Sequence, residues 1–365
     1  MERDELAAWL RLLETPQVGR ESARKLLAAF GSPEGVVDAS SAARREVVGA
    51  VAAEALATPP DALDALIAAT LAWLEADDAQ ARTVIPLGDP RYPDALLNTA
   101  DPPLMLYAQG RVDLLHADSV AIVGSRNPTP QGKSNARDFA MAVSQAGLPV
   151  VSGLALGIDG AAHEGALDGA AGTIAVVGTG LDRVYPKRHL ALAHRIVRDG
   201  LIVSEYSLGT PPLPANFPQR NRIIAGLARG TLVVEAAVQS GSLITARLAS
   251  EAGRDVFAVP GSIHSPQSRG CHLLIKQCAK LVDSAQDILE ELNWAAKPAV
   301  AANAQAPVKA DPLLDALGFD PVSLELLVVR TGWSAAELST RLLDLELAGA
   351  VARLPGQLFQ RMSVG

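Results

Sequence analysis

Four loops in the middle of the chain carry residues whose types and spacing could bind or transform a ligand. The first spans residues 124–134 (GSRNPTPQGKS) and places a glycine, a hydroxyl and the guanidinium of Arg126 ahead of an expected helix. Amides at a helix start and a guanidinium both bind phosphate oxygens, so this loop favours a phosphate ligand. Its end, residues 132–134 (GKS), matches the end of a P-loop, but Asn127 stands where that motif requires glycine. A triphosphate is therefore not indicated, and the alternative is an ordinary loop with a solvated arginine.

Two further loops add stacking and anion-binding groups. In residues 216–222 (NFPQRNR), Phe217 lies beside two arginines, ahead of an apolar helix expected from Ile223. A phenyl ring stacks on a nucleobase for roughly 1–3 kcal/mol per base, and guanidinium groups take phosphates. The alternative is a core phenylalanine with arginines paired to acids. Residues 238–245 (VQSGSLIT) place small residues at a helix start, where free amides favour an anion, or where a serine is a simple N-cap.

A fourth loop, residues 151–160, leaves an enzymatic alternative open. Asp159 and His163 lie four residues apart on an expected helix and could form an acid/base pair. The structural alternative is an Asp that caps the helix and a buried His. Glu235 ends an apolar run, where a catalytic carboxylate and an acid paired with an arginine both fit. These residues would serve a nucleotide-processing hydrolase.

Metal and cofactor chemistry is not expected. Cys271, His272 and Cys278 could supply three ligands, but they contain no C-x-x-C pair. The chain has no G-x-G-x-x-G dinucleotide loop and no G-x-S-x-G nucleophile elbow. With only two cysteines, a disulfide framework is excluded and a reducing compartment fits.

Six short apolar runs supply the elements that must position these loops. They cover residues 119–124, 148–153, 173–178, 201–204, 231–235 and 255–259, and each is separated from the next by roughly one helix. Continuous apolar strands that alternate with helices predict a doubly wound, Rossmann-type parallel sheet over residues 81–292. Five prolines between 86 and 103 indicate an extended stretch ahead of it. Ligands bind beyond the carboxyl ends of such strands, so we expect a binding site at that end of the sheet.

A smaller domain is expected at each end of the chain. Residues 1–78 show helical apolar spacing and predict an all-α domain, and residues 15–27 resemble a helix-hairpin-helix. Residues 293–310 have no periodicity and predict a linker. Residues 311–365 predict three short helices and then two strands, 351–354 and 357–360, the order of a winged helix.

Charge is distributed unevenly. The 32 Lys and Arg and 40 Asp and Glu give a net charge of −8, with −7 in residues 1–80, zero in 81–292 and −1 in 293–365. If any part of the chain binds a polyanion, the charge distribution favours the middle domain. The 311–365 segment alone is −3, so we expect it to make protein contacts rather than bind duplex DNA. The N-terminus resembles no secretory signal and no apolar run is long enough for a membrane helix, which favours a cytoplasmic protein without membrane contact.

The loops taken in order resemble one family, the bacterial DNA-processing protein A family (DprA/Smf). The resemblance covers residues 80–290 through GSR at 124–126, SGLALGID at 152–159, YP at 185–186, NFP at 216–218, RNRII at 220–224, SGSLITA at 240–246, VPGS at 259–262 and SRGCH at 268–272. It implies a recombination mediator without enzymatic activity, which shields incoming single-stranded DNA during natural transformation and helps load the RecA recombinase. It also implies a homodimer through the α/β domain, and residues 1–78 resemble the family's sterile-alpha-motif-like region. The DNA-binding residues that follow from the resemblance and the loops are Gly124, Ser125, Arg126, Asn216, Phe217, Arg220, Asn221, Arg222, Gly241 and Ser242.

Overall fold

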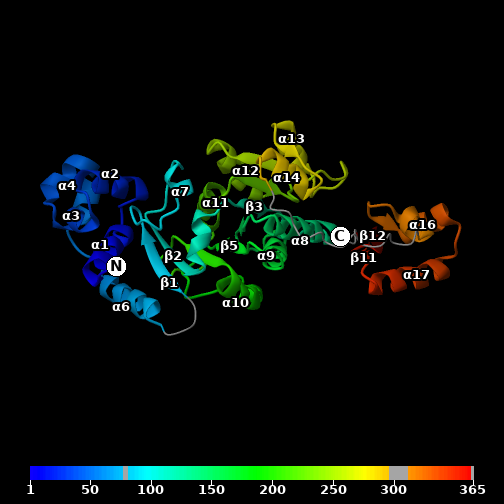
Figure 1. Cartoon of the computed structure of the whole chain (residues 1–365), viewed down its shortest axis with the longest axis horizontal. Coiled ribbons are helices and arrows are strands. Elements are labelled where there is room, and N and C mark those ends of the chain that lie inside the picture. The colour runs from blue at the N-terminus through cyan, green and yellow to red at the C-terminus, as the bar shows by residue number, and fades with distance from the viewer. Residues whose placement is uncertain (77–80, 296–310, 363–365) are drawn as a thin grey trace.

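A nine-stranded sheet forms the centre of the molecule (Figure 1). The structure, a computed structural model, describes residues 1–76, 81–295 and 311–362. Strand order is β1-β2-β6-β5-β4-β3-β7-β8-β9. The strands are β1 (Arg82–Pro86), β2 (Met105–Gly110), β3 (Val120–Val123), β4 (Val150–Ser152), β5 (Thr173–Val176), β6 (Leu201–Ser204), β7 (Gly230–Val233), β8 (Asp255–Ala258) and β9 (Lys280–Leu281).

The six apolar runs become the six central strands, β3 to β8, and these are parallel, which confirms the predicted α/β core. Both faces of β3 are buried: Ala121 and Val123 belong to one apolar cluster, and Val120 and Ile122 to the other. Successive side chains of a strand point to opposite faces, so a strand covered on both sides must be apolar throughout.

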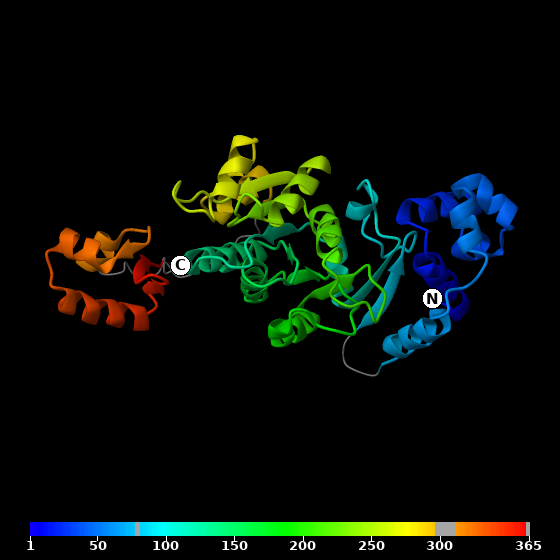
Figure 2. The same cartoon turned by 180° about the vertical axis from the view of Figure 1, so that it is seen from behind.

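Helices cover the two faces of this sheet (Figure 2). One apolar cluster includes residues of α7 (Asp94–Leu97), α11 (Asn216–Leu227), α12 (Ser242–Glu251) and α13 (Arg269–Lys276). The opposite clusters include residues of α8 (Pro130–Gln145), α9 (Ile158–Leu167), α10 (Leu190–Asp199) and α14 (Ala285–Glu291). The short helices η1 (Val112–His116) and η2 (Lys187–His189) lie in the connections.

One edge of the sheet differs from the expectation of an extended, proline-rich lead-in. There β1 pairs antiparallel with β2, and β2 pairs antiparallel with β6. The prolines between residues 86 and 103 lie in the connection between these two strands, with Pro86 as the last residue of β1. Proline is tolerated at a sheet edge because no ladder hydrogen bond is lost on the open side.

The N-terminal helices pack on this edge. They are α1 (Arg3–Glu14), α2 (Arg20–Phe30), α3 (Pro33–Asp38), α4 (Ser41–Val48), α5 (Ala50–Ala55) and α6 (Leu63–Leu74). Their apolar core is shared with Val84, Met105 and Tyr107 of β1 and β2. The all-α region therefore forms one hydrophobic core with the edge of the sheet.

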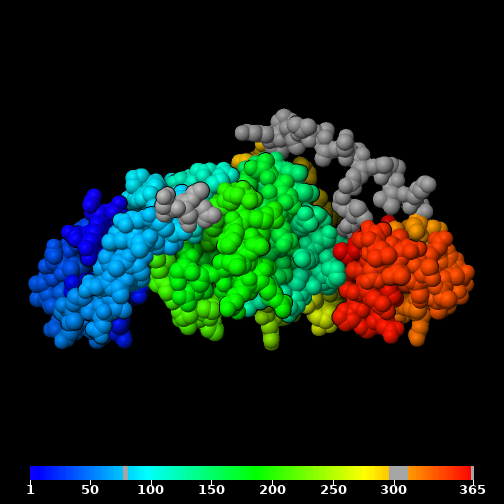
Figure 3. Space-filling view, turned by 90° about the horizontal axis from the view of Figure 1, so that it is seen from below, coloured from blue at the N-terminus to red at the C-terminus, as the bar shows by residue number. Residues whose placement is uncertain are grey.

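The C-terminal region is a winged helix, as predicted. It contains α15 (Pro312–Leu317), β10 (Val322–Ser323), α16 (Leu324–Thr331), α17 (Ala335–Leu347), β11 (Val351–Leu354) and β12 (Leu358–Arg361), with sheet order β10-β12-β11. Figure 3 shows it at the opposite end of the molecule from the N-terminal helices. Residues 296–310 of the predicted linker lie outside the described residues. Among the helices of the described ranges, none is both long and apolar enough to span a bilayer.

Candidate functional site

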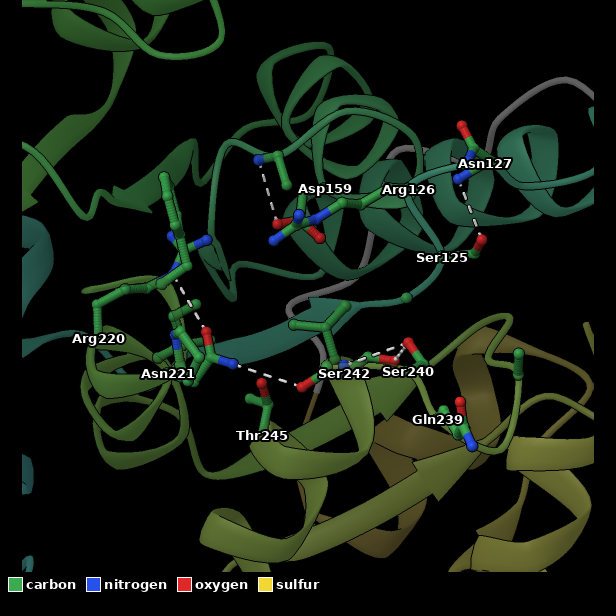
Figure 4. A pocket seen from close by; sticks show the side chains of 18 of the residues that line it. Ser125, Arg126, Asn127, Asp159, Arg220, Asn221, Gln239, Ser240, Ser242 and Thr245 are labelled. Atoms are coloured by element: carbon green, nitrogen blue, oxygen red, sulfur yellow. Dashed lines mark hydrogen bonds between the residues drawn. The ribbon is translucent and has the colours of Figure 1, made fainter. Parts of the chain in front are cut away.

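A pocket of about 460 Å³ opens beyond the carboxyl ends of the central strands. Its walls come from the loop between β3 and α8, the loop before α9, the first turns of α11, and the loop between β7 and α12. Figure 4 shows Arg126 and Asp159 on one side, Ser240, Ser242 and Thr245 opposite them, and Arg220 and Asn221 on α11. Eight of the ten predicted DNA-binding residues line it: Gly124, Ser125, Arg126, Phe217, Arg220, Asn221, Gly241 and Ser242.

The loop after β3 is held tightly by its neighbours. The amide of Ser125 donates to the carbonyl of Glu235 at 2.7 Å, and the carbonyl of Ser125 accepts the amide of Ile158 at 3.1 Å. A Cβ on Gly124 would lie 2.7 Å from Ile158 Cγ1, so only glycine allows this approach. Arg126 follows with an exposed side chain and makes no ion pair with any described residue.

An aromatic surface lies next to Arg126. The Arg126 guanidinium carbon is 5.9 Å from the centre of the Phe217 ring, within the range of a cation–π contact. The ring of Tyr185 lies 5.5 Å from that of Phe217, with the two planes tilted by 42°. Tyr185 is 48% exposed, so a flat ring and an unpaired guanidinium face solvent together.

Arg220 is different, because it is a buried charge in the lining of the pocket. Its Nη1 donates to the carbonyl of Gly153 at 2.6 Å and also to the carbonyl of Val176, and its Nε donates to Asn221 Oδ1 at 3.1 Å. Burial lowers its pKa to about 10, so the group is a cation at neutral pH. Arg220 therefore fixes the strand ends through Nη1 and adds positive potential to the pocket.

Asp159 adds one carboxylate to the same pocket. It is buried, and its Oδ2 accepts the Ala155 amide at 3.3 Å. Burial raises the pKa of Asp159, whereas Arg220 and Arg126 lower it. Two guanidinium groups against one carboxylate leave the charged lining with a net positive charge.

The opposite wall is polar and neutral. Ser240 Oγ lies 2.7 Å from Ser242 Oγ, and the Ser242 amide donates to Ser240 Oγ at 3.3 Å. Asn221 Nδ2 donates to the Gly241 carbonyl at 3.5 Å. The Ser242 amide, expected to be free for an anion, is therefore already used within the loop.

Two predicted residues, Asn216 and Arg222, lie outside the pocket. Asn216 is buried and its Nδ2 donates to the carbonyl of Gly178 at 3.1 Å. Arg222 pairs with Glu205 and lies 3.1 Å from Asp101. Residues 216–222 form the first turns of α11, not the loop that was expected, and a helix cannot present all of its side chains to one ligand.

The candidate enzymatic residues are not brought together. His163 is fully buried beside Thr173, 2.7 Å from its Oγ1, and burial lowers the pKa of His163 to about 3. Glu235 accepts the amide of Thr129 at 2.9 Å and its hydroxyl at 2.5 Å. Of the three candidates only Asp159 lines the pocket. Within the described ranges, no three His, Cys, Asp or Glu side chains cluster as a metal site would require.

The sequence interpretation missed several lining residues, including Asn127, Gln239, Ser240, Thr245 and Gln267. The first four lie in loops that had been singled out, and their neighbours were chosen instead. Gln267 comes from a segment without a chemical pattern, and its Nε2 reaches the Asn127 carbonyl at 3.4 Å.

Comparisons with known proteins identify the family of the chain. The family model for DNA recombination-mediator protein A matches residues 83–293, and that for the DprA winged helix domain matches 297–357. Protein Smf of Escherichia coli is 43% identical over 300 residues, which cover 80% of this chain and 79% of that protein. DNA processing protein DprA of Streptococcus pneumoniae is 50% identical over 206 residues, 56% of this chain and 73% of that one.

Two solved structures are also similar. The X-ray structure of DprA from Streptococcus pneumoniae has a TM-score of 0.68 at 37% identity and covers 80% of this chain and 98% of that one. A structure of DNA processing protein A from Helicobacter pylori, described for its single-stranded DNA binding mode, has a TM-score of 0.53 at 31% identity. It covers 60% of this chain and 97% of that one. This chain belongs to the DNA recombination-mediator protein A family.

Proposed function

We propose that this protein binds single-stranded DNA in the pocket beyond strands β3 and β7. The observation that carries the proposal is the exposed, unpaired Arg126 above the Phe217 ring. A guanidinium takes a phosphate oxygen and a ring takes a base, so the pair matches one nucleotide of a strand. The Helicobacter pylori relative, whose structure concerns single-stranded DNA, supports the same ligand class.

Single strands fit better than duplexes. Stacking on Phe217 or Tyr185 requires an open base face, which a duplex hides between its own base pairs. The hydroxyls of Ser240 and Ser242 bond to each other, so they are less available to read a base edge. We therefore propose binding without strong sequence preference.

The biological role that we propose follows from the family. The protein would act in the cytoplasm as a recombination mediator that protects incoming single strands during natural transformation and helps load RecA recombinase. It would have no catalytic activity. We further propose a homodimer through the α/β domain, which is supported by exposed apolar side chains near the β9 edge, Val238, Leu273 and Leu281.

The winged helix is proposed to contact protein. Its longest helix, α17, exposes Leu343 and Leu347. The same helix carries three acidic residues and a single basic one: Glu337, Asp344, Glu346 and Arg341. A helix of this composition is poorly suited to a DNA groove, where phosphates require cations.

The test is fluorescence anisotropy of a labelled single-stranded oligonucleotide, with unlabelled single strand or duplex as competitor. We expect tight binding that single strand displaces and duplex displaces weakly. Equal displacement by duplex, or no binding, would contradict the proposal. Turnover of free nucleotides by the same preparation would instead support a hydrolase acting through Asp159, the one candidate acid in the pocket.

A further inference from the structure

A second groove of about 560 Å³ lies on the other side of the loop between β3 and α8. Its walls include Pro130, Lys133, Glu164 and His189, and it shares Arg126 and Asn127 with the main pocket. The two hollows are therefore neighbours that meet at these two residues. A DNA strand that is bound in the pocket and continues past Arg126 would enter the groove.

Lys133 is a second cation of this groove, beside Arg126. Lys133 is exposed on the first turns of α8, and its side-chain ammonium makes no hydrogen bond or ion pair with a described residue. The nearby amides are already used, because Thr129 N donates to Glu235 and Gly132 N donates to Thr129 Oγ1 at 3.0 Å. A phosphate in the groove would therefore depend on the Lys133 ammonium, a point charge on a flexible stem.

The far wall is fixed in place by His189. Its Nδ1 lies 3.0 Å from the carbonyl oxygen of Leu154. A Cβ on Gly160 would lie 2.7 Å from His189 Cε1, so the ring packs directly on the start of α9. Glu164 is the one carboxylate among the residues that line the groove, set against Arg126 and Lys133.

We propose that this groove is a second phosphate subsite, in which Lys133 binds the backbone of a nucleotide that follows the one in the pocket. The subsite rests on the proposed function, because it lengthens the same path for a single strand. It assigns a role to the P-loop-like residues 132–134, in which the lysine binds a phosphodiester and not a nucleoside triphosphate.

The experiment measures anisotropy against salt for labelled oligothymidylates of three and twelve nucleotides, with wild type, Lys133→Ala, Arg137→Ala and Arg126→Ala. Arg137 is the matched control, because it lies one turn further along α8, is 56% exposed at the side chain, and pairs with Asp168 away from the groove. Loss of one phosphate contact lowers the slope of log affinity against log salt by about 0.7. We expect Lys133→Ala to bind the twelve-mer several-fold more weakly with that smaller slope, while the three-mer is unaffected.

Glu164→Gln should have the opposite effect, because removal of the negative charge should strengthen binding of the twelve-mer. If Lys133→Ala and Arg137→Ala match wild type at both lengths while Arg126→Ala weakens binding, the subsite is overturned and the pocket stands. If wild type binds neither oligonucleotide, the proposed function fails together with the subsite.

Discussion

Arg126 and Arg220 both line the pocket, but their surroundings give them different roles. Arg126 is exposed and makes no ion pair with a described residue, with its guanidinium near the Phe217 ring. Arg220 is 3% exposed, and its Nη1 donates to two backbone carbonyls. A sequence shows two arginines in loops and does not show which of them is already bonded. Mutation should separate the two roles.

Arg220→Ala should destabilise the fold. The carbonyls of Gly153 and Val176 would lose their partner in a buried place, and each unsatisfied group costs about 1–3 kcal/mol. We expect the free energy of unfolding in urea to fall by about 3 kcal/mol, while Arg126→Ala, an exposed change, stays within about 0.5 kcal/mol of wild type. Equal stability of the two variants would refute the structural role of Arg220.

Asp159 should make DNA binding depend on pH. Burial raises the pKa of Asp159, so the carboxyl takes up a proton sooner than an exposed one as the pH falls. The protonated form removes a negative charge beside the bound phosphate, so affinity should increase as the pH falls through that raised pKa. Asp159→Asn should bind at pH 8 as tightly as wild type binds at low pH, with a flatter profile.

The measurement is the Kd for a single strand from pH 8 to pH 5 at constant ionic strength. The raised pKa also means that the folded chain holds this proton more tightly than the unfolded chain. Wild type therefore loses stability as the pH rises through that pKa, and Asp159→Asn should be no less stable than wild type at pH 8. A profile that is the same for both proteins would exclude Asp159 as the titrating group.

At the scale of elements, Glu235 joins the end of β7 to the start of α8. Its carboxylate accepts both the amide and the hydroxyl of Thr129, and burial raises the pKa of Glu235. This bond sets the position of the loop that carries Arg126. Glu235 is thus placed as a structural acid, but its partner is Thr129 and not the arginine that the sequence interpretation named as the alternative to catalysis.

Glu235→Ala should loosen that loop without removing a phosphate contact. We expect DNA affinity to fall about tenfold while the salt slope stays that of wild type, because Arg126 is still present. Hydrogen exchange at the Thr129 amide should become faster, since its acceptor is gone. Unchanged exchange at Thr129 would show that another contact holds the loop.

The elements differ in how well the sequence predicts them. Strands buried on both faces are continuous apolar runs, so β3 to β8 could be predicted. The edge strands β1 and β2 could not, because prolines dominate the segment between them. The sequence interpretation began α11 at Ile223, whereas the helix begins at Asn216. Residues 216–222 were therefore treated as a loop and not sorted by helical face. In the helix, positions 217, 220, 221 and 224 face the pocket, and Arg222 faces away.

For the whole molecule, the N-terminal helices are part of the structural unit that holds the pocket. Arg20 and Arg24 of α2 lie 2.8 and 2.7 Å from Asp101, which also pairs with Arg222 of α11. In a helix-hairpin-helix, which residues 15–27 resemble, Arg20, Arg24 and Lys25 would be candidates to contact DNA. In the structure, Arg20 and Arg24 face Asp101, and Lys25 pairs with Glu21 at 2.7 Å.

Removal of residues 1–80 should therefore destabilise the α/β domain. Tyr107 and Met105 are fully buried under these helices, and each large apolar side chain that becomes exposed costs roughly 1.5–3 kcal/mol. We expect urea unfolding at a clearly lower midpoint than for the full chain. Removal of residues 311–365, which have their own apolar core, should leave the midpoint of the α/β domain unchanged. A larger fall in the midpoint after removal of residues 311–365 than after removal of residues 1–80 would contradict this assignment.

The central claim is that one exposed guanidinium above an aromatic ring binds the backbone of a single strand. The most direct measurement is the salt dependence of single-strand affinity for wild type, Arg126→Ala and Arg229→Ala. Arg229 is the control because its side chain is 41% exposed and pairs with Asp118. It precedes β7 at the amino ends of the parallel strands, the end of the sheet opposite the pocket. We predict that Arg126→Ala weakens binding at least tenfold and lowers the salt slope by about 0.7, while Arg229→Ala matches wild type. Equal slopes for all three proteins would show that the DNA binds elsewhere.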